Sequence, residues 1–304
     1  MKKNKIIIIG GTGFIGFHLA KFLLKKNFEV ISVSRNKPKK IRFLKKVKYI
    51  KANIIFKKKL LNSLKNHLDS KFIINCGGEV EHKQIKKTFL SHYKGSENIA
   101  NIFLNSSLKK FIQIGSSLEY GSLKSPQSEK VVCKPESSYS RAKYLASKSL
   151  LDFYRNFNLP LVLIRPYQLY GPAQDVNRFI PFVIKACLKN KYFPCSEGKQ
   201  HRDFLYIDDF VNFIFKVILK DNIKGEIFNI GYGHPIKINE IIYKITKIIR
   251  KGRPEFGKIK LRTEENLITY PNIKKAIKLI KWKPKEKIDS GLKKTIKYYK
   301  NLYL

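Results

Sequence analysis

The sequence predicts an α/β fold built on a doubly wound parallel sheet, and three observations support this prediction. Apolar runs of strand length alternate with longer segments of helical period through the first half of the 304 residues, a pattern typical of βαβ units. Prolines break the second half into short pieces, which indicates a smaller second lobe. Apolar residues make up 43% of the chain, enough for a real core, which argues against a disordered or fibrous protein.

The first half contains six expected strands and four expected helices. The strands fall at 6–9, 30–33, 47–51, 72–75, 111–114 and 161–164, and the helices at 14–26, 58–68, 85–104 and 138–156. Their alternation accounts for a six-stranded, doubly wound sheet. We therefore expect a sheet domain at 1–166, joined by about 204–232, and a smaller, mostly helical substrate-binding lobe at 167–203 and 233–304.

The strongest local motif is the glycine-rich run Gly-Gly-Thr-Gly-Phe-Ile-Gly at 10–16, which follows the first strand and opens the first helix. Glycines let the backbone turn tightly and approach a pyrophosphate, whose charge then lies on free N–H groups at the helix N-terminus. A turn without ligand needs one glycine, and four are present. The run therefore predicts a dinucleotide site in a Rossmann domain, with these cofactor-binding residues: Gly10, Gly13, Phe14, Ile15 and Gly16.

The end of the second strand indicates which nicotinamide cofactor is bound. A carboxylate there bonds the ribose 2′-hydroxyl of NAD, whereas Arg or Lys accommodates the 2′-phosphate of NADP. No acid lies between Glu29 and Asp69, and Arg35 stands where a phosphate partner would be useful. This favours NADP, with NAD as the alternative. The simpler interpretation of Arg35 is one more exposed cation in a basic protein.

Tyr139 and Lys143 open the helix expected at 138–156, and their i, i+4 spacing places the phenol and the ammonium on one face. A nearby cation favours the phenolate form of a tyrosine, whose ordinary pKa is about 10. Tyr-x-x-x-Lys alone is most often an ordinary helix surface. Here it follows a strand that ends in Gly115-Ser116-Ser117, at the sheet edge where open α/β folds bind ligands, so we interpret it as part of a site.

Together these motifs resemble the extended short-chain dehydrogenase/reductase family, specifically its branch of nucleotide-sugar epimerases, dehydratases and reductases. The resemblance covers essentially the whole chain. It rests on Tyr139 with Lys143 and on four runs: 10–16, 115–121, 165–172 and 202–209.

This resemblance implies roles for six residues. Ser116 would hydrogen-bond the reacting sugar oxygen, Tyr139 would be the acid/base, and Lys143 would bind the nicotinamide ribose while tuning Tyr139. Planar cations suit bidentate pairing with a diphosphate, and an amide can also contact it. The implied substrate-binding residues are Gln168, Arg178 and Arg202, and the simpler interpretation of the two arginines is that they are solvent-exposed.

The chain departs from this branch at three places. Dehydratases carry an Asp-Glu pair directly after the catalytic hydroxyl residue, whereas this chain has Ser117-Leu118. Glu119 lies one position later, and on an extended segment it points to the opposite face. Dehydration therefore lacks its acid and base, and decarboxylation lacks its Glu at position 118. His92 stands where the family usually has Asn, and Gln168 stands where relatives often have Asn.

The charge balance raises a different class of function. The 63 basic and 22 acidic residues give a net charge of +41, so a polyanionic partner such as nucleic acid has to be considered. Only ten of the basic residues are Arg, and the lysines are scattered among Ile and Asn, a pattern more typical of a solvated surface than of a binding stripe. A Rossmann-fold nucleic-acid-binding protein stays as the alternative of another class.

The remaining features favour a cytoplasmic protein without a metal. The four cysteines and six histidines lack metal-ligand spacing. The first apolar run is too short for a signal peptide, and no run reaches the length of a membrane span, so no membrane partner is expected. A homodimer is left open. Glu79, Glu81 and His82 follow the fourth strand and either border the substrate or form a polar loop.

We therefore expect an NADP-dependent reductase that transfers hydride to a nucleotide-linked 4-keto-6-deoxyhexose. The alternative is a nucleotide-sugar 4-epimerase, which uses the same Ser116, Tyr139 and Lys143 but keeps NAD bound throughout. The missing carboxylate at the end of the second strand favours the reductase, because a reductase benefits from the reduced NADPH pool.

Overall fold

The computed structural model describes residues 3–79, 84–261 and 266–303 of the chain. The chain divides into two compact units. The first comprises Met1–Gly121, Val132–Pro166 and Val211–Phe228, and the second comprises Ser122–Val131, Tyr167–Phe210 and Asn229–Leu304. The segment Ser122–Val131 thus groups with the second unit, although it lies inside the sheet domain expected from the sequence.

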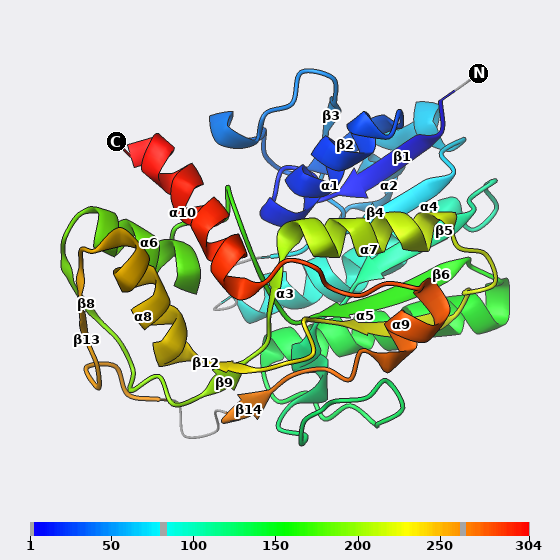
Figure 1. The fold of residues 1–304 in the computed structure, drawn as a ribbon. Coiled ribbons are helices and arrows are strands. Elements are labelled where there is room, and N and C mark those ends of the chain that lie inside the picture. The colour runs from blue at the N-terminus through cyan, green and yellow to red at the C-terminus, as the bar shows by residue number, and fades with distance from the viewer. Residues whose placement is uncertain (1–2, 80–83, 262–265, 304) are drawn as a thin grey trace. The chain divides into compact units, whose positions relative to one another are not determined.

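A seven-stranded sheet forms the centre of the first unit (Figure 1), in the order β11-β6-β5-β4-β1-β2-β3. The strands β1 to β6 pair in parallel, which confirms the doubly wound class. The strand bounds are β1 Lys5–Ile9, β2 Glu29–Ser34, β3 Lys48–Lys51, β4 Phe72–Asn75, β5 Lys110–Ile114, β6 Leu161–Pro166 and β11 Glu226–Ile230. The predicted count of six was wrong by one strand, because β11 comes from the proline-broken second half.

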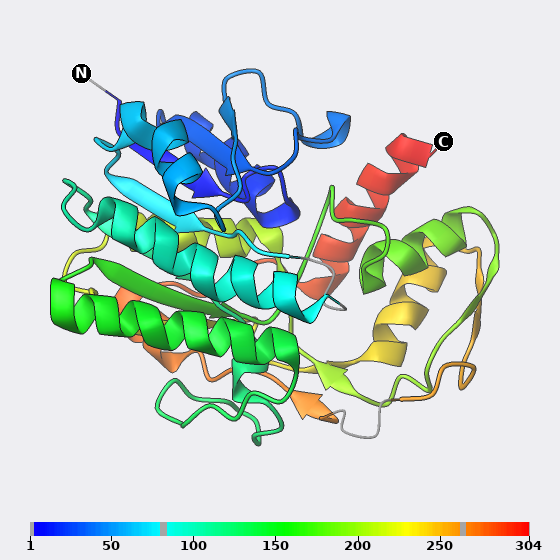
Figure 2. The same ribbon diagram turned by 180° about the vertical axis from the view of Figure 1, so that it is seen from behind.

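Helices cover both faces of this sheet, as Figures 1 and 2 show from opposite sides. Their bounds are α1 Phe14–Lys25, α2 Lys57–Leu64, α3 Ile85–Phe89, α4 Gly95–Phe103, α5 Ser138–Phe157 and α7 Ile207–Leu219. A π-helical turn, Leu90–Lys94, joins α3 to α4, so the helix expected at 85–104 contains a local widening. The core consists of apolar side chains from β1, β2, β4 and β5 packed under α4, among them Ile7, Ile31, Ile73, Phe103 and Phe111.

The second unit is mostly helical, as the sequence predicts. In its described residues the helices are α6 Phe179–Leu188, α8 Ile238–Ile249, α9 Lys274–Ile280 and α10 Ile288–Tyr303. Short strands form three small sheets, β10-β7, β12-β9-β14 and β13-β8. Their bounds are β7 Gln168–Tyr170, β8 Tyr192–Pro194, β9 His201–Arg202, β10 Phe204–Tyr206, β12 Ile236–Lys237, β13 Arg253–Glu255 and β14 Ile268–Thr269.

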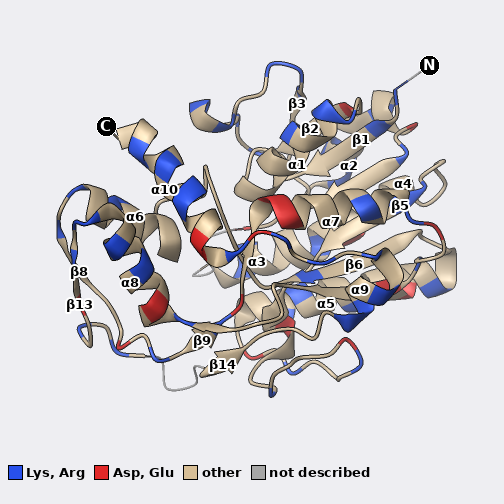
Figure 3. Ribbon diagram, in the orientation of Figure 1, with Lys and Arg blue, Asp and Glu red and all other residues tan. Residues whose placement is uncertain are grey.

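The distribution of basic residues, the helices and the acidic, His and Cys side chains bear on possible partners of the protein. Lys and Arg are spread over helices of both units, including α5, α8, α9 and α10 (Figure 3). Within the described ranges, every helix is too short or too polar to cross a bilayer, and these ranges contain no group of three acidic, His or Cys side chains arranged to hold a metal ion.

Candidate active site

The glycine-rich turn between β1 and α1 is held in a shape that requires glycine. Gly10 has a φ of +73°, and a Cβ on Gly16 would lie 2.5 Å from the carbonyl oxygen of Gly10. The N–H of Gly13 donates to that same oxygen at 3.0 Å. Phe14 and Ile15 then start α1, whose first turn has no acid and whose N-cap supplies no side-chain bond. This end of α1 therefore suits the pyrophosphate of a dinucleotide.

A cavity of about 190 Å³ opens beside this turn. Residues that follow four adjacent strands line it, as expected for the switch point of a doubly wound sheet. We call it the cofactor cavity, and its lining includes Gly10, Thr12, Gly13, Ser34, Arg35, Asn36, Asn53, Cys76, Gly77, Gly78 and Ser91. The glycine turn and Arg35 thus border one space, as the sequence predicts for a dinucleotide site.

Arg35 has a partner that the sequence did not indicate. Its Nη1 atom lies 3.0 Å from Oε2 of Glu79, and the two side chains are 45% and 15% exposed. The sequence argument for NADP depended on the absence of an acid near the end of β2. The fold brings the carboxylate of Glu79, from the turn after β4, into contact with the guanidinium of Arg35, which weakens the argument.

Ser116 follows β5 and starts the 3₁₀ turn Ser117–Tyr120. It is buried, and its Oγ accepts the N–H of Leu118 at 3.2 Å. Its own N–H donates to Oε1 of Glu119 at 2.8 Å. Because a hydroxyl has one proton to give and two lone pairs, the O–H proton of Ser116 stays available to donate to a substrate oxygen.

Glu119 is fully buried, and both of its carboxylate oxygens accept hydrogen bonds inside the protein. Its Oε2 accepts from Nε of Arg165 at 3.0 Å, and Nη1 of Arg165 donates to the hydroxyl of Tyr120 at 2.9 Å. Burial lowers the pKa of Arg165, but Glu119, Tyr120 and Cys133 together more than offset this effect, so the pKa of Arg165 lies above its ordinary value. Glu119 therefore positions Ser116 and does not stand in for the acidic pair of dehydratases.

Tyr139 and Lys143 lie one turn apart at the start of α5, which Ser137 caps by accepting the N–H of Ser140. Lys143 is buried, and its Nζ donates to the carbonyl oxygen of Ile114 at 2.7 Å. Ile114 ends β5, two residues before Ser116. The structure therefore brings the ammonium of Lys143 to the strand end that leads into Ser116.

His92 contacts both Tyr139 and the turn after β4. The rings of His92 and Tyr139 lie edge to face, with centroids 5.1 Å apart. Nε2 of His92 lies 3.0 Å from the carbonyl oxygen of Glu79, which can only accept, so Nε2 carries the proton. A Cβ on Gly78 would lie 1.8 Å from Cε1 of His92, so this packing needs glycine there. The histidine that stands where the family usually has Asn therefore bonds the main chain of Glu79.

Glu81 and His82, which the sequence singled out with Glu79, lie outside the described residues.

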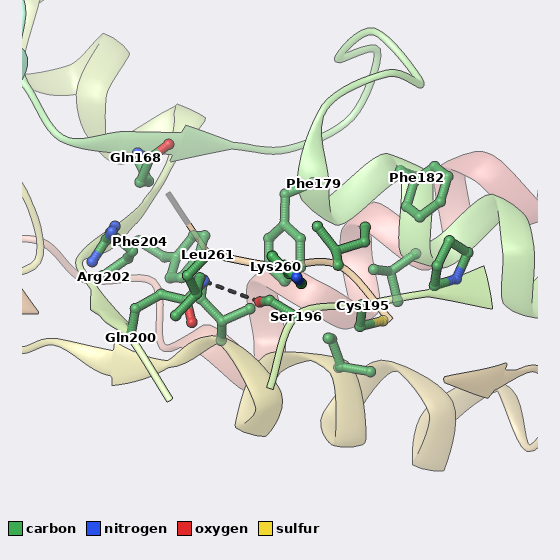
Figure 4. Close-up of a pocket in the computed structure, with 15 residues that line it drawn as sticks. Gln168, Phe179, Phe182, Cys195, Ser196, Gln200, Arg202, Phe204, Lys260 and Leu261 are labelled. Atoms are coloured by element: carbon green, nitrogen blue, oxygen red, sulfur yellow. Dashed lines mark hydrogen bonds between the residues drawn. The ribbon is translucent and has the colours of Figure 1, made fainter. Parts of the chain in front are cut away.

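The second unit has its own pocket, of about 400 Å³. Figure 4 shows Gln168 and Arg202 at one end and Phe182 and Cys195 at the other. The remaining wall is largely apolar and aromatic and includes Phe179, Val183, Phe204, Ile238, Ile242 and Leu261. A flat apolar ring linked to an anion fits such a lining, with the cation at one end. Two of the three predicted substrate residues, Gln168 and Arg202, therefore line one pocket, whereas Arg178 is exposed at the N-cap of α6.

Asp203, next to Arg202, is a buried residue whose role sequence reasoning missed. Its Oδ1 and Oδ2 accept the N–H groups of Tyr232 and Gly233, each at 2.6 Å. Burial raises the pKa of Asp203 from its ordinary 3.8 to about 7, although these bonds oppose the shift. Asp203 thus anchors the loop after β11 and holds the main chain beside Arg202. The Arg-Asp pair in the sequence was the available signal.

The parallel sheet with its glycine turn and strand-end residues is the architecture of a dinucleotide-binding enzyme of the Rossmann class. A sequence model described as the NAD dependent epimerase/dehydratase family matches residues 6–231. The chain belongs to this family, which confirms the resemblance found in the sequence.

Relatives in this family carry out more than one reaction. The chain is 31% identical over 272 residues to the dTDP-D-glucose 4,6-dehydratase of Dictyostelium discoideum, which covers 81% of the chain but 62% of that relative. It is 26% identical over 315 residues to the UDP-glucuronate 4-epimerase of Thermodesulfobacterium geofontis, covering 97% of the chain and 95% of the relative.

Solved structures show the same fold over nearly the whole chain. The UDP-glucose 4-epimerase of Thermotoga maritima superposes with a TM-score of 0.93 at 22% identity, covering 99% of this chain and 100% of that one. The UDP-glucuronic acid 4-epimerase from Bacillus cereus, in complex with UDP-glucuronic acid and NAD, gives a TM-score of 0.89 at 26% identity, covering 98% and 100%.

Proposed function

We propose that the protein is a nucleotide-sugar 4-epimerase that works with NAD. The observation that carries this proposal is a combination of two features. Ser116 after β5 and Tyr139 with Lys143 on α5 can serve proton transfer, whereas Ser117 and Leu118 provide no eliminating acid and base. The carboxylate of Glu79 beside Arg35 favours NAD over NADP. Relatives named as 4-epimerases, one of them solved with NAD, support the same assignment.

The residues of the first unit divide the proton chemistry among them. NAD, when bound, supplies reversible hydride acceptance from the sugar. The O–H of Ser116 donates a hydrogen bond to the 4-oxygen of the sugar, and this hydrogen bond strengthens as negative charge develops on that oxygen. Tyr139 takes the proton of that oxygen and later returns it, which requires the same group to be base and then acid. Lys143, held by the carbonyl of Ile114, lies one helical turn after Tyr139 and would bind the nicotinamide ribose.

The pocket of the second unit suits the nucleotide part of such a substrate. Its aromatic lining offers a surface for a base, and Arg202 offers a planar cation for the diphosphate. Gln168 adds an amide at the same end. These groups suit the carrier part of a nucleotide sugar.

A 4-keto reductase remains the second candidate, and Arg35 is the observation that favours it. Arg35 lines the cofactor cavity and is nearly half exposed, so it could pair with the 2′-phosphate of NADP. Glu79 would then have to give up this cation.

The decisive experiment has two parts. One sample of the purified protein is denatured, and the released nucleotide is identified. A second, intact sample is incubated with UDP- and dTDP-hexoses without added cofactor. The epimerase predicts bound NAD and interconversion of two saturated nucleotide sugars with no change in NADH absorbance. Stoichiometric oxidation of NADPH by a nucleotide-linked 4-keto-6-deoxyhexose would instead establish the reductase.

A further inference from the structure

The main chain of Glu79 is held in place by two hydrogen bonds. Its N–H donates to Oγ of Ser91 at 2.9 Å, and its carbonyl accepts from Nε2 of His92 at 3.0 Å. Ser91 and His92 belong to the π-helical turn Leu90–Lys94, and the neighbouring Gly78 packs directly under the His92 ring. Two hydrogen bonds thus hold the main chain of Glu79 against the π-helical turn, which fixes the origin of its side chain.

The carboxylate of Glu79 is linked to the cofactor cavity through Arg35, and the neighbouring Gly78 lines that cavity. The Glu79 side chain is 15% exposed and pairs with Arg35, which lines that cavity between Ser34 and Asn36. Arg35 is 45% exposed and has the longer side chain, so it is the partner that can move. The site at the end of β2 thus contains one fixed negative charge and one adjustable positive charge.

We propose that Glu79 sets the preference of this protein for NAD over NADP. Its carboxylate accepts the hydrogen bond of the ribose 2′-hydroxyl, the task that an acid at the end of the second strand performs in other dinucleotide-binding folds. A 2′-phosphate would bring negative charge toward this carboxylate and would compete with it for Arg35. The inference deepens the proposed function and depends on it only in requiring a bound nicotinamide dinucleotide.

The test is a competition for the resident cofactor. The protein is incubated to equilibrium with equal excesses of NAD and NADP, freed of unbound nucleotide and denatured, and the released NAD:NADP ratio is measured. We expect the wild-type protein to retain NAD in excess and Glu79→Gln, which removes the charge but keeps the shape, to shift the ratio toward NADP by about tenfold or more. An unchanged ratio in Glu79→Gln, or NADP in excess in the wild-type protein, would overturn the proposal.

Glu97→Gln is the matched control. Glu97 is 16% exposed and paired with Lys94 in the same unit, but its partner Lys94, unlike Arg35, does not line the cofactor cavity. Its variant should keep the wild-type ratio. If Glu97→Gln shifted the ratio as Glu79→Gln does, the effect would be one of general charge and the proposal would fail.

Arg35→Ala provides a second variant that does not disturb the turn after β4. If Glu79 binds the 2′-hydroxyl itself, Arg35→Ala keeps NAD in excess and lowers the retained NADP further. A shift toward NADP in this variant would contradict the proposal. The ratio requires no sugar turnover, so an inactive protein whose ratio responds to Glu79→Gln would remove the proposed function and leave this inference standing.

Discussion

The two cavities of this protein are built from different material. In the cofactor cavity the main chain of the turn from Gly10 to Gly16 defines the shape, and three of its glycines could not carry a Cβ without clash. In the pocket of the second unit, side chains such as Phe179, Phe204 and Arg202 define the shape. The glycine turn of the cofactor cavity is one continuous run of residues, whereas the pocket of the second unit is formed by residues from separate segments. Substitutions should therefore act differently in the two places.

The largest effect should come from Gly16→Ala. Its Cβ would lie 2.5 Å from the carbonyl oxygen of Gly10, so the turn must shift and the cofactor cavity must change shape. We expect loss of the resident dinucleotide, measured as nucleotide released on denaturation. Gly257→Ala is the control, because a Cβ there meets nothing within 4 Å and only the positive φ opposes it. Full cofactor content in Gly16→Ala would show that the main chain does not define this cavity.

Tyr139→Phe should lower turnover by roughly a hundredfold or more, since it removes the acid/base. Cofactor content should stay near that of the wild-type protein, because the glycine turn is untouched. Tyr144→Phe, on the same helix α5, should retain full turnover. Wild-type turnover in Tyr139→Phe on the true substrate would exclude the proposed mechanism.

The side-chain pocket should show a smaller effect, on substrate affinity. Arg202→Ala should raise KM for the nucleotide sugar by about tenfold or more, the scale of a lost charged hydrogen bond, with kcat little changed. Arg178→Ala should have less effect, because Arg178 is exposed and does not line the pocket. Equal effects of the two variants would place the diphosphate outside this pocket.

The smallest effect concerns stability and Asp203. Its pKa is raised by burial to about 7, so between its ordinary value and about 7 the folded protein holds a proton that the unfolded chain has released. Stability should therefore fall as the pH rises through this window, by at most roughly 1.4 kcal/mol per pH unit from this group. Urea unfolding at about pH 5 and 7 should show a steeper loss for the wild-type protein than for Asp203→Asn. Equal losses would show that Asp203 does not titrate there.

Local motifs made most of the fold and the first half of the site predictable. The glycine run, Ser116 and the Tyr139–Lys143 pair each lie within one strand end or one helical turn, so their spacing alone carries the geometry. Strand β11 was missed because its run Glu226–Ile230 contains polar residues and comes from the irregular second half. The contact of Arg35 with Glu79 joins positions 44 residues apart, and no local pattern reports such a distance. The pocket beside Arg202 was foreseen only through family resemblance.

The buried pair of Glu119 and Arg165 also limits how this protein can acquire a new reaction. Any neutral residue at 119 would leave the buried charge of Arg165 without a carboxylate to balance it, at a cost of about 3–5 kcal/mol. Leu118, in contrast, is 49% exposed and can be exchanged for a polar residue at little cost to folding. Within this short turn, position 118 tolerates a catalytic side chain, whereas position 119 is required for the stability of the fold. A lineage leading from this chain to an eliminating enzyme would therefore run through position 118 and keep Glu119 unchanged.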